Sequence, residues 1–302
     1  MKIGFIGLGI MGRPMAMKLV QHGYEVMVSD LREEAAADLV SSGAEYADKK
    51  KLGGECDCVG MILPNADAVR EVIFGEDGLA ETMAPGSIIV DHSSVSAGDS
   101  RECESRLKEK GIRFLDAPVS GGETGAQAGE LAVMVGGDEE AYEELKPVFT
   151  SYAASVMHMG ACGAGSVTKL ANQIIVNNNI AVVSEALTFA KKCGVDPERV
   201  YHAIRCGAAG SAVLDQKAPM MIDHDFQPGG TVRVVYKDIR NVLNTAQALD
   251  IPVPYSAQLF EIMKVVKNEG YFEADHSSLV RYWEMLSGVR LDQDVQDEEE
   301  DK

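Results

Sequence analysis

The feature that most constrains this chain is a glycine turn close to its start. The motif Gly7-Leu-Gly9-Ile-Met-Gly12 follows the apolar segment Lys2–Ile6, which has the length and composition of a β-strand. A helical pattern is expected over about 11–22, and a second strand over 24–29. Strand, glycine turn, helix and strand in this order form a βαβ unit, which belongs to a parallel sheet.

This arrangement predicts a bound dinucleotide. The glycines allow a tight turn and a close approach of the pyrophosphate to the helix N-terminus. Asp30 lies 18 positions after Gly12, where a carboxylate accepts hydrogen bonds from ribose hydroxyls and repels a 2′-phosphate, so NAD is favoured. Arg32 keeps NADP open, because a guanidinium could pair with that phosphate. The cofactor residues predicted from this segment are Gly7, Gly9, Ile10, Met11, Gly12, Asp30, Leu31 and Arg32.

Strand and helix patterns alternate through the first half of the chain, as in a doubly wound α/β sheet of the Rossmann type. Further strands are expected at 58–63, 87–91, 113–118, 130–135 and 156–159, and helices at 33–42, 66–74, 98–110 and 139–150. Ligands of such sheets lie at the carboxyl ends of the strands. Polar and turn residues at these ends are therefore candidates for binding.

Three strand ends carry such residues, namely Leu63-Pro64-Asn65, the segment 91–94 with Ser94, and Asp116-Ala-Pro-Val-Ser120-Gly121-Gly122. The first two are ordinary turn sequences. The third would expose backbone N–H groups and a hydroxyl, which suit a carboxylate. A flexible turn without a ligand is the alternative that the spacing leaves open.

One long helix is expected from about 166 to 193, roughly 40 Å in length. Ser166 is the expected N-cap, and Lys191, Lys192 and Gly194 suit its C-terminal end. Most faces are apolar, so we expect the helix to be buried for most of its length. Its polar residues lie in one sector, with Asn172 beside it: Lys169, Gln173, Asn177, Ser184 and Thr188. A lone lysine in such a helix more often extends to water than performs chemistry.

Beyond residue 194 only helices are expected, at 198–205, 212–221, 232–249, 256–268 and 276–287. We therefore expect a Rossmann-type NAD(P)-binding domain at 1–162 and an all-α substrate and oligomerisation domain at 163–290. The segment 163–193 is the helix that joins them. Residues 291–302 are rich in Asp and Glu and are expected to form a solvated acidic tail.

Composition excludes several classes of partner. The net charge of −19 argues against nucleic acid and anionic membranes. The six cysteines show no repeated spacing and no signal peptide precedes them, so reduced thiols in the cytoplasm are expected. Cys56-Asp-Cys58 lacks a second pair of ligands, and no metal site is expected.

The chain resembles the β-hydroxyacid dehydrogenase family, which includes 3-hydroxyisobutyrate dehydrogenase and tartronate semialdehyde reductase. The resemblance extends to about Val289 and rests on four motifs in the same order. These are the segment 4–16 at the cofactor turn, Asp116–Gly122, Gly163-Ala-Gly-Ser-Val-Thr-Lys169-Leu-Ala-Asn172, and Lys237-Asp238.

The resemblance implies that Lys169 is the catalytic acid and base, and that Ser120, Gly121 and Gly122 hold a substrate carboxylate. It implies that Asn172 orients the reacting oxygen and that Lys237 lies near nicotinamide and substrate. Leu63, Pro64, Asn65 and Ser94 are the further cofactor residues. Many members have asparagine at the position of Gln173, so it is open whether Asn172 or Gln173 contacts substrate.

Within the family, 170–173, 205–211, 217–220 with Asp223 and Phe226, and 275–280 are most similar to the tartronate semialdehyde reductases. The implied reaction is NAD(P)-dependent interconversion of a small 3-oxo acid and its 3-hydroxy acid, here tartronate semialdehyde and D-glycerate. The alternatives are 3-hydroxyisobutyrate dehydrogenase activity, another substrate of the same kind, or a non-catalytic NAD-binding scaffold. Lys169 disfavours an imine reductase. A homo-oligomer, dimer or tetramer, is expected.

Overall fold

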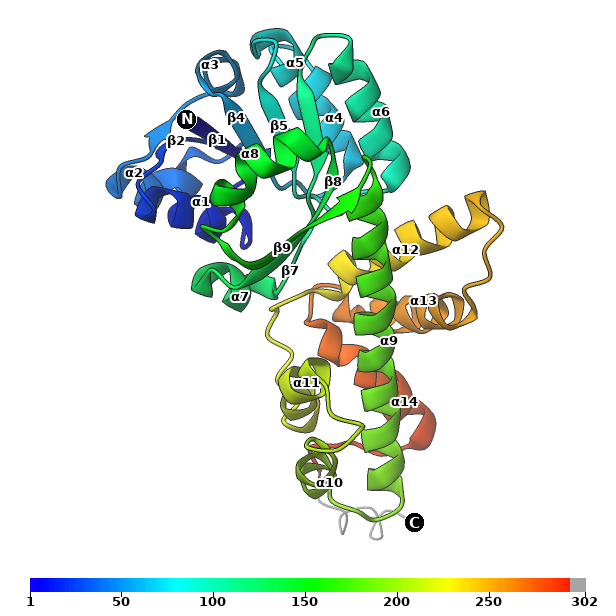
Figure 1. Ribbon diagram of the computed structural model, residues 1–302. Coiled ribbons are helices and arrows are strands. Elements are labelled where there is room, and N and C mark those ends of the chain that lie inside the picture. Colours follow the sequence, from blue (N-terminus) through cyan, green and yellow to red (C-terminus); the bar gives the residue numbers. More distant parts are fainter. Residues whose placement is uncertain (294–302) are drawn as a thin grey trace. The chain divides into compact units, whose positions relative to one another are not determined.

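The computed structural model describes residues 1–293, and the predicted acidic tail lies almost wholly outside them. The chain forms two compact units, Met1–Lys169 and a second that begins at Leu170. Helix α9 (Ala164–Lys192) continues across this boundary (Figure 1).

The first unit contains a nine-stranded sheet in the order β3-β2-β1-β4-β5-β6-β8-β7, with β9 paired to β8 (Figure 1). Its strands from β3 to β6 are parallel, and β8 runs antiparallel to β6 and β7. This confirms the predicted Rossmann-type sheet. The strands are β1 (Lys2–Ile6), β2 (Glu25–Ser29), β3 (Glu45–Tyr46), β4 (Cys58–Met61), β5 (Ile88–Asp91), β6 (Arg113–Asp116), β7 (Val119–Ser120), β8 (Leu131–Gly137) and β9 (Ala153–Gly160).

Helices connect these strands and bury two apolar clusters against the sheet. They are α1 (Gly12–Gln21), α2 (Ala37–Ser41) after a 3₁₀ turn (Glu33–Ala36), α3 (Lys49–Glu55), α4 (Ala66–Phe74), α5 (Leu79–Thr82), α6 (Ala97–Lys108), α7 (Gly122–Ala128) and α8 (Glu139–Phe149). The sequence did not predict α3, α5 and α7. These helices have four to seven residues, too few for a clear periodic pattern.

The second unit is helical, as predicted. Between residues 170 and 293 the backbone forms no strand ladder, and Thr231 and Asp275 make one isolated bridge. One apolar core joins α9 to α12 and α13 through Ile180, Leu187, Ile239 and Met263. The elements are α10 (Pro197–Ile204), α11 (Ala212–Ile222), α12 (Val232–Ala248), α13 (Pro254–Val266), a π-helical turn (Lys267–Tyr271), a 3₁₀ turn (His276–Leu279) and α14 (Val280–Ser287).

Two expectations for the long helix are wrong. It begins at Ala164, so Ser166 lies inside its first turn and is not the N-cap. The reason is Asp116, which accepts hydrogen bonds from the backbone N–H groups of Gly163 and Ser166 and so lets the helix start earlier. The expected burial also fails on one apolar face, where Val167, Ile175, Val182 and Phe189 are exposed.

Candidate functional site

The glycine turn has the shape that a dinucleotide requires. Gly7 has a φ of +93°, and a Cβ atom there would overlap the carbonyl oxygen of Ile62. A Cβ atom at Gly12 would overlap the carbonyl oxygen of Gly7, whereas Gly9 has open space beside it. Among the described residues no side chain caps α1, so its first N–H groups suit an anionic group. Gly7, Gly9 and Gly12 thus fit a bound pyrophosphate.

Asp30 is fixed beside this turn at the end of β2. Its Oδ2 accepts a hydrogen bond from the Leu8 N–H at 2.7 Å, and its Oδ1 accepts one from the Arg32 N–H at 2.9 Å. Ile10, Leu31 and Arg32 are exposed, and Met11 is half-buried. The first unit therefore brings together the glycine turn and the predicted ribose acceptor.

The ends of β4 and β5 are joined by Ser93, which the sequence reasoning did not select. The Leu63 N–H donates to its Oγ at 2.8 Å, and the Ser93 N–H donates to Asp91 Oδ1 at 2.9 Å. A hydroxyl directly after a strand was the available signal. Asn65 accepts a hydrogen bond from the Ala68 N–H and caps α4. Leu63, Pro64, Asn65 and Ser94 thus lie in two loops, the first tied to β5 by Ser93.

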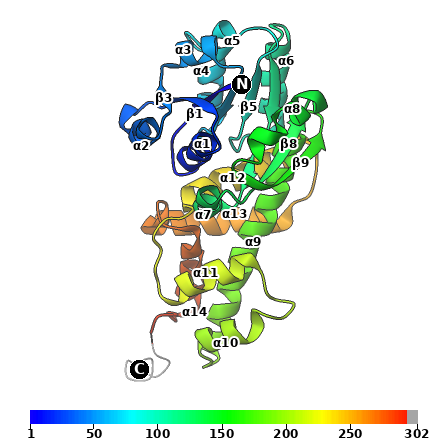
Figure 2. The same ribbon diagram turned by 60° about the vertical axis from the view of Figure 1, so that its left-hand side comes forward.

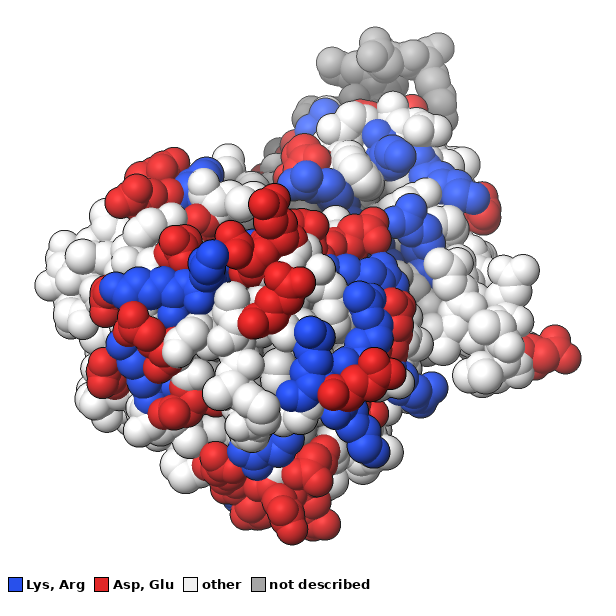
Figure 3. Space-filling view, turned by 90° about the horizontal axis from the view of Figure 1, so that it is seen from above, with Lys and Arg blue, Asp and Glu red and all other residues white. Residues whose placement is uncertain are grey.

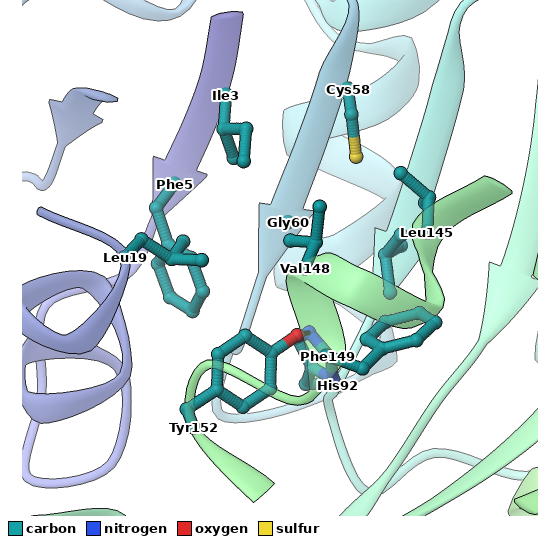
Figure 4. A pocket seen from close by; sticks show the side chains of 11 residues that line it. Ile3, Phe5, Leu19, Cys58, Gly60, His92, Leu145, Val148, Phe149 and Tyr152 are labelled. Atoms are coloured by element: carbon teal, nitrogen blue, oxygen red, sulfur yellow. Dashed lines mark hydrogen bonds between the residues drawn. The ribbon is translucent and has the colours of Figure 1, made fainter. Parts of the chain in front are cut away.

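A small void lies between the sheet and helix α8, lined mainly by apolar side chains and by His92 and Tyr152 (Figure 4). Its volume is about 10 Å³, close to that of one water molecule, so it cannot hold a substrate. His92 Nδ1 lies 2.6 Å from the Ala117 carbonyl oxygen, and the Tyr152 hydroxyl lies 3.1 Å from His92 Nε2. Burial lowers the pKa of His92 to about 4. This histidine is a neutral link in the core.

The predicted substrate corner is the beginning of a short helix. Ser120 ends β7 and is half-buried, and α7 begins at Gly122. Gly121 and Gly122 are exposed and have positive φ values of 136° and 64°, which only glycine adopts readily. The corner therefore presents main chain to solvent next to one hydroxyl.

Helix α9 carries the predicted catalytic and amide residues. Lys169 and Asn172 are partly exposed, whereas Gln173 is buried. In the second unit the Gln173 amide nitrogen donates to Asp238 Oδ2 at 2.5 Å. Lys237 Nζ lies 3.5 Å from Asp238 Oδ1. Gln173 and Lys237 thus meet at one buried carboxylate.

Asp238 belongs to the Lys237-Asp238 motif but was not predicted as a site residue. It is almost fully buried, because it lies among the inward-facing residues of the amphipathic helix α12. An acidic residue at an inward position of such a helix was the signal that could have identified it.

The surface shows mixed charge. In the face of Figure 3, Lys and Arg lie among Asp and Glu, and the described residues form no continuous basic area there. Ion pairs of this kind include Lys50 with Asp77 at 2.9 Å and Arg113 with Glu144 at 2.7 Å. None of the helices in residues 1–293 has the length and apolarity needed to cross a membrane.

In a comparison with known proteins, each half of the chain matches a protein family. Residues 2–160 match the family described as the NAD binding domain of 6-phosphogluconate dehydrogenase. Residues 163–283 match the family described as NAD-binding of NADP-dependent 3-hydroxyisobutyrate dehydrogenase.

Similar proteins cover almost the entire chain. A 2-hydroxy-3-oxopropionate reductase of Escherichia coli K12 is 40% identical over 96% of this chain and 100% of its own length. A 2-(hydroxymethyl)glutarate dehydrogenase of Eubacterium barkeri is 35% identical over 96% of this chain and 97% of its own. The crystal structure of a 3-hydroxyisobutyrate dehydrogenase from Salmonella typhimurium superposes with a TM-score of 0.85 at 32% identity, covering 93% of this chain and 99% of that chain.

Proposed function

Because the chain belongs to the β-hydroxyacid dehydrogenase family and is an NAD(P)-dependent oxidoreductase, we propose that it interconverts tartronate semialdehyde and D-glycerate. The observation that carries the proposal is the 40% identity to a 2-hydroxy-3-oxopropionate reductase over that enzyme's full length. Tartronate semialdehyde is another name for 2-hydroxy-3-oxopropionate.

A related substrate is the second candidate. The relative named for 2-(hydroxymethyl)glutarate is 35% identical, and the structure named for 3-hydroxyisobutyrate is 32% identical. These substrates share a carboxylate and a primary hydroxyl with D-glycerate and differ in the further substituent on C2, which is a hydroxyl, a methyl or a carboxyethyl group. A site that binds the C2 hydroxyl would lose its hydrogen bonds to a methyl group, so this substituent, and not the common groups, decides between the substrates. The motifs that hold the common groups therefore serve either substrate.

Lys169 is the proposed acid and base. When bound, the dinucleotide supplies or accepts the hydride. In reduction, the Lys169 ammonium donates a hydrogen bond to the aldehyde oxygen and then a proton to the alkoxide. In oxidation, the neutral amine removes the hydroxyl proton. The hydride thus passes between the dinucleotide and the substrate carbon, whereas the proton passes between Lys169 and the substrate oxygen.

Ser120, Gly121 and Gly122 are the proposed donors to the substrate carboxylate. The exposed main chain of the corner and the adjacent hydroxyl support this role. Holding the carboxylate limits the rotation of a small aldehyde and thereby orients its reacting carbon. Asn172, Gln173 and Lys237 are proposed substrate residues because their motifs resemble those of the family, and Lys237 is also proposed to contact the cofactor.

Asp30 supports a preference for NAD. Its carboxylate is held in place by the N–H groups of Leu8 and Arg32 and would repel a 2′-phosphate. Arg32 is exposed and is the residue that could favour NADP. Leu63, Pro64, Asn65 and Ser94 are the further proposed cofactor residues.

We also propose a homo-oligomer that buries the exposed apolar face of α9. Val167, Ile175, Val182 and Phe189 are spaced by seven or eight residues and lie on one face of the helix. Two copies related by a two-fold axis would present the same stripe to each other, which is the commonest way to cover such a face.

One assay tests the substrate and cofactor assignments together. Oxidation of NADH and NADPH is measured with tartronate semialdehyde, methylmalonate semialdehyde, succinate semialdehyde and glyoxylate. We expect the highest kcat/KM for tartronate semialdehyde with NADH. A higher value for methylmalonate semialdehyde would instead assign the 3-hydroxyisobutyrate reaction, and a higher value with NADPH would overturn the NAD preference.

A further inference from the structure

A buried carboxylate at the end of β6 holds the beginning of α9. Asp116 is 1% exposed. Its Oδ1 accepts a hydrogen bond from the Gly163 N–H and its Oδ2 accepts one from the Ser166 N–H, both at 2.7 Å. Each carboxylate oxygen thus binds one of the amides that a helix leaves without an internal partner. Both amides belong to the segment that leads to Lys169.

Glycines allow the backbones to approach closely at this junction. A Cβ atom on Gly165 would lie 2.5 Å from the Asp116 carbonyl oxygen and would overlap the carbonyl oxygen of Met134. A Cβ atom on Gly136 would overlap Asp116 Oδ1. The first turn of α9 is therefore pressed against β6 and β8. In Figure 2 the start of α9 lies by the ends of β8 and β9. Hydrogen bonds and close packing together leave this turn little freedom to shift.

The same aspartate begins the segment that reaches the substrate corner. Ser120 follows four residues after Asp116. The segment between them is also fixed, because His92 binds the Ala117 carbonyl oxygen at 2.6 Å and the Met134 N–H donates to the Pro118 carbonyl oxygen at 3.1 Å. Lys169 lies three residues after Ser166 on α9. One carboxylate thus joins the two segments that hold the proposed acid and the proposed carboxylate donors.

We infer that Asp116 is a positioning residue that sets the location of Lys169 relative to the corner at Ser120, Gly121 and Gly122, an inference that rests on the proposed function. Asp116 acts through Lys169 and the corner rather than on the substrate. Misplacement of a catalytic group by about 1 Å can lower a rate about 100-fold, so a rigid junction has a direct effect on turnover.

The variant Asp116→Asn tests this role. Asparagine can accept one of the two backbone N–H groups, but its own amide nitrogen would face the other. We expect kcat per NADH-binding site to fall about 10-fold to 100-fold with tartronate semialdehyde. We expect KM and the Kd of NADH to stay within about threefold, because the corner and the glycine turn keep their own donors.

Asp138→Asn is the matched control. Asp138 caps α8 by accepting a hydrogen bond from the Ala141 N–H at 2.9 Å, and α8 carries none of the proposed site residues. A general cost of losing a helix cap would affect both variants alike, whereas a positioning role predicts wild-type kcat for Asp138→Asn. Equal losses in the two variants, or an unchanged kcat in Asp116→Asn, would overturn the inference.

Ser166→Ala covers the case in which Asp116→Asn does not fold. The Ser166 hydroxyl lies 3.1 Å from that of Ser100, and its loss weakens the junction while both backbone donors to Asp116 remain. We expect kcat to fall about threefold to tenfold with KM unchanged. If Asp116→Asn does not fold and Ser166→Ala keeps the wild-type kcat, the inference is wrong.

The same measurements separate this inference from the proposed function. If the wild-type enzyme reduces no semialdehyde, or if Lys169→Ala is fully active, the proposed function is wrong. If the wild-type enzyme is active, Lys169→Ala is inactive and Asp116→Asn has normal kcat, only the role of Asp116 is wrong.

Discussion

Helix α9 buries apolar residues such as Ile180 and Leu187, but it also has a buried polar sector and an exposed apolar stripe, and these two sectors contrast. The inward sector, defined as Lys169, Gln173, Asn177, Ser184 and Thr188, is polar, and its last four residues are buried. The outward sector, defined as Val167, Ile175, Val182 and Phe189, is apolar. Its last three side chains are 69%, 62% and 71% exposed. A helix in a monomer would normally place the apolar residues inward. The contrast is the basis of two proposals, that the inward sector carries the chemistry and that the outward sector forms the interface of an oligomer.

The inward polar groups are satisfied largely by the helix itself. The hydroxyls of Ser184 and Thr188 donate to the carbonyl oxygens of Ile180 and Ser184, and the Asn177 amide donates to that of Gln173, at 2.8–2.9 Å. Such bonds to the preceding turn let polar side chains enter a core without other partners. Gln173 differs, because its amide nitrogen binds the carboxylate of Asp238.

The largest effect is expected at the start of the inward sector. Lys169→Met keeps an unbranched apolar stem but removes the proton donor, so kcat with tartronate semialdehyde should fall by at least about 100-fold. Binding of NADH, followed by fluorescence, should be unchanged. Lys192→Met at the exposed end of the same helix is the control and should retain wild-type turnover. A Lys169→Met enzyme with near-normal kcat would show that the inward sector does not supply the proton donor.

A smaller loss is expected from Gln173→Leu. The substitution leaves buried Asp238 without its amide donor, which costs about 1–3 kcal/mol of unfolding free energy. Because Asp238 also contacts Lys237, we expect kcat/KM to fall about 10-fold. Urea unfolding and steady-state kinetics measure the two effects. Gln247→Leu, at an exposed position of α12, should change neither. Normal stability of Gln173→Leu would show that the inward sector does not depend on this contact.

Charges on the outward sector should change assembly and spare the chemistry. Val182→Asp combined with Phe189→Asp should at least halve the molar mass measured by light scattering, because a carboxylate is costly to bury at an interface. Turnover per NADH-binding site should stay within about threefold of wild type, well below the change expected at Lys169. Gln247→Asp is the control, because it adds a carboxylate at an exposed position of another helix, α12. An unchanged mass for the double variant would refute assembly through this face.

The smallest effect is expected from Thr188→Val. The two side chains have nearly the same shape, and the threonine hydroxyl binds only a carbonyl oxygen of its own helix. The unfolding free energy should change by less than about 1 kcal/mol, with kcat unaffected. A loss of activity here would mean that the inward sector acts as a unit along its whole length rather than at its first turns.

Local patterns were sufficient to predict most of the fold. Strand and helix periodicities, with Gly7, Gly9, Gly12 and Asp30, identified the sheet and its cofactor turn, because these features depend on residues close in sequence. The helical character of the second half followed from its caps and apolar spacing. The short helix at Gly122–Ala128 was missed, since a segment of only seven residues that includes two glycines gives little helical signal.

Long-range partners could not be predicted from the sequence. The start of α9 depends on Asp116, 47 residues before Gly163, and the burial of Gln173 depends on Asp238, 65 residues later. Ser93 likewise joins two strands that are separate in the chain. The apolar composition of α9 predicts burial, but its sequence does not show that part of this surface is exposed in the single chain.

The most direct test of the account is the pH dependence of D-glycerate oxidation by the wild-type enzyme and by Lys169→Met. In this direction Lys169 must be neutral to accept the hydroxyl proton, so the wild-type kcat/KM should rise with pH as the ammonium form is lost. The variant should show low activity without this rise. A Lys169→Met enzyme that keeps the wild-type pH profile would show that another group carries the proton, and the central claim would be wrong.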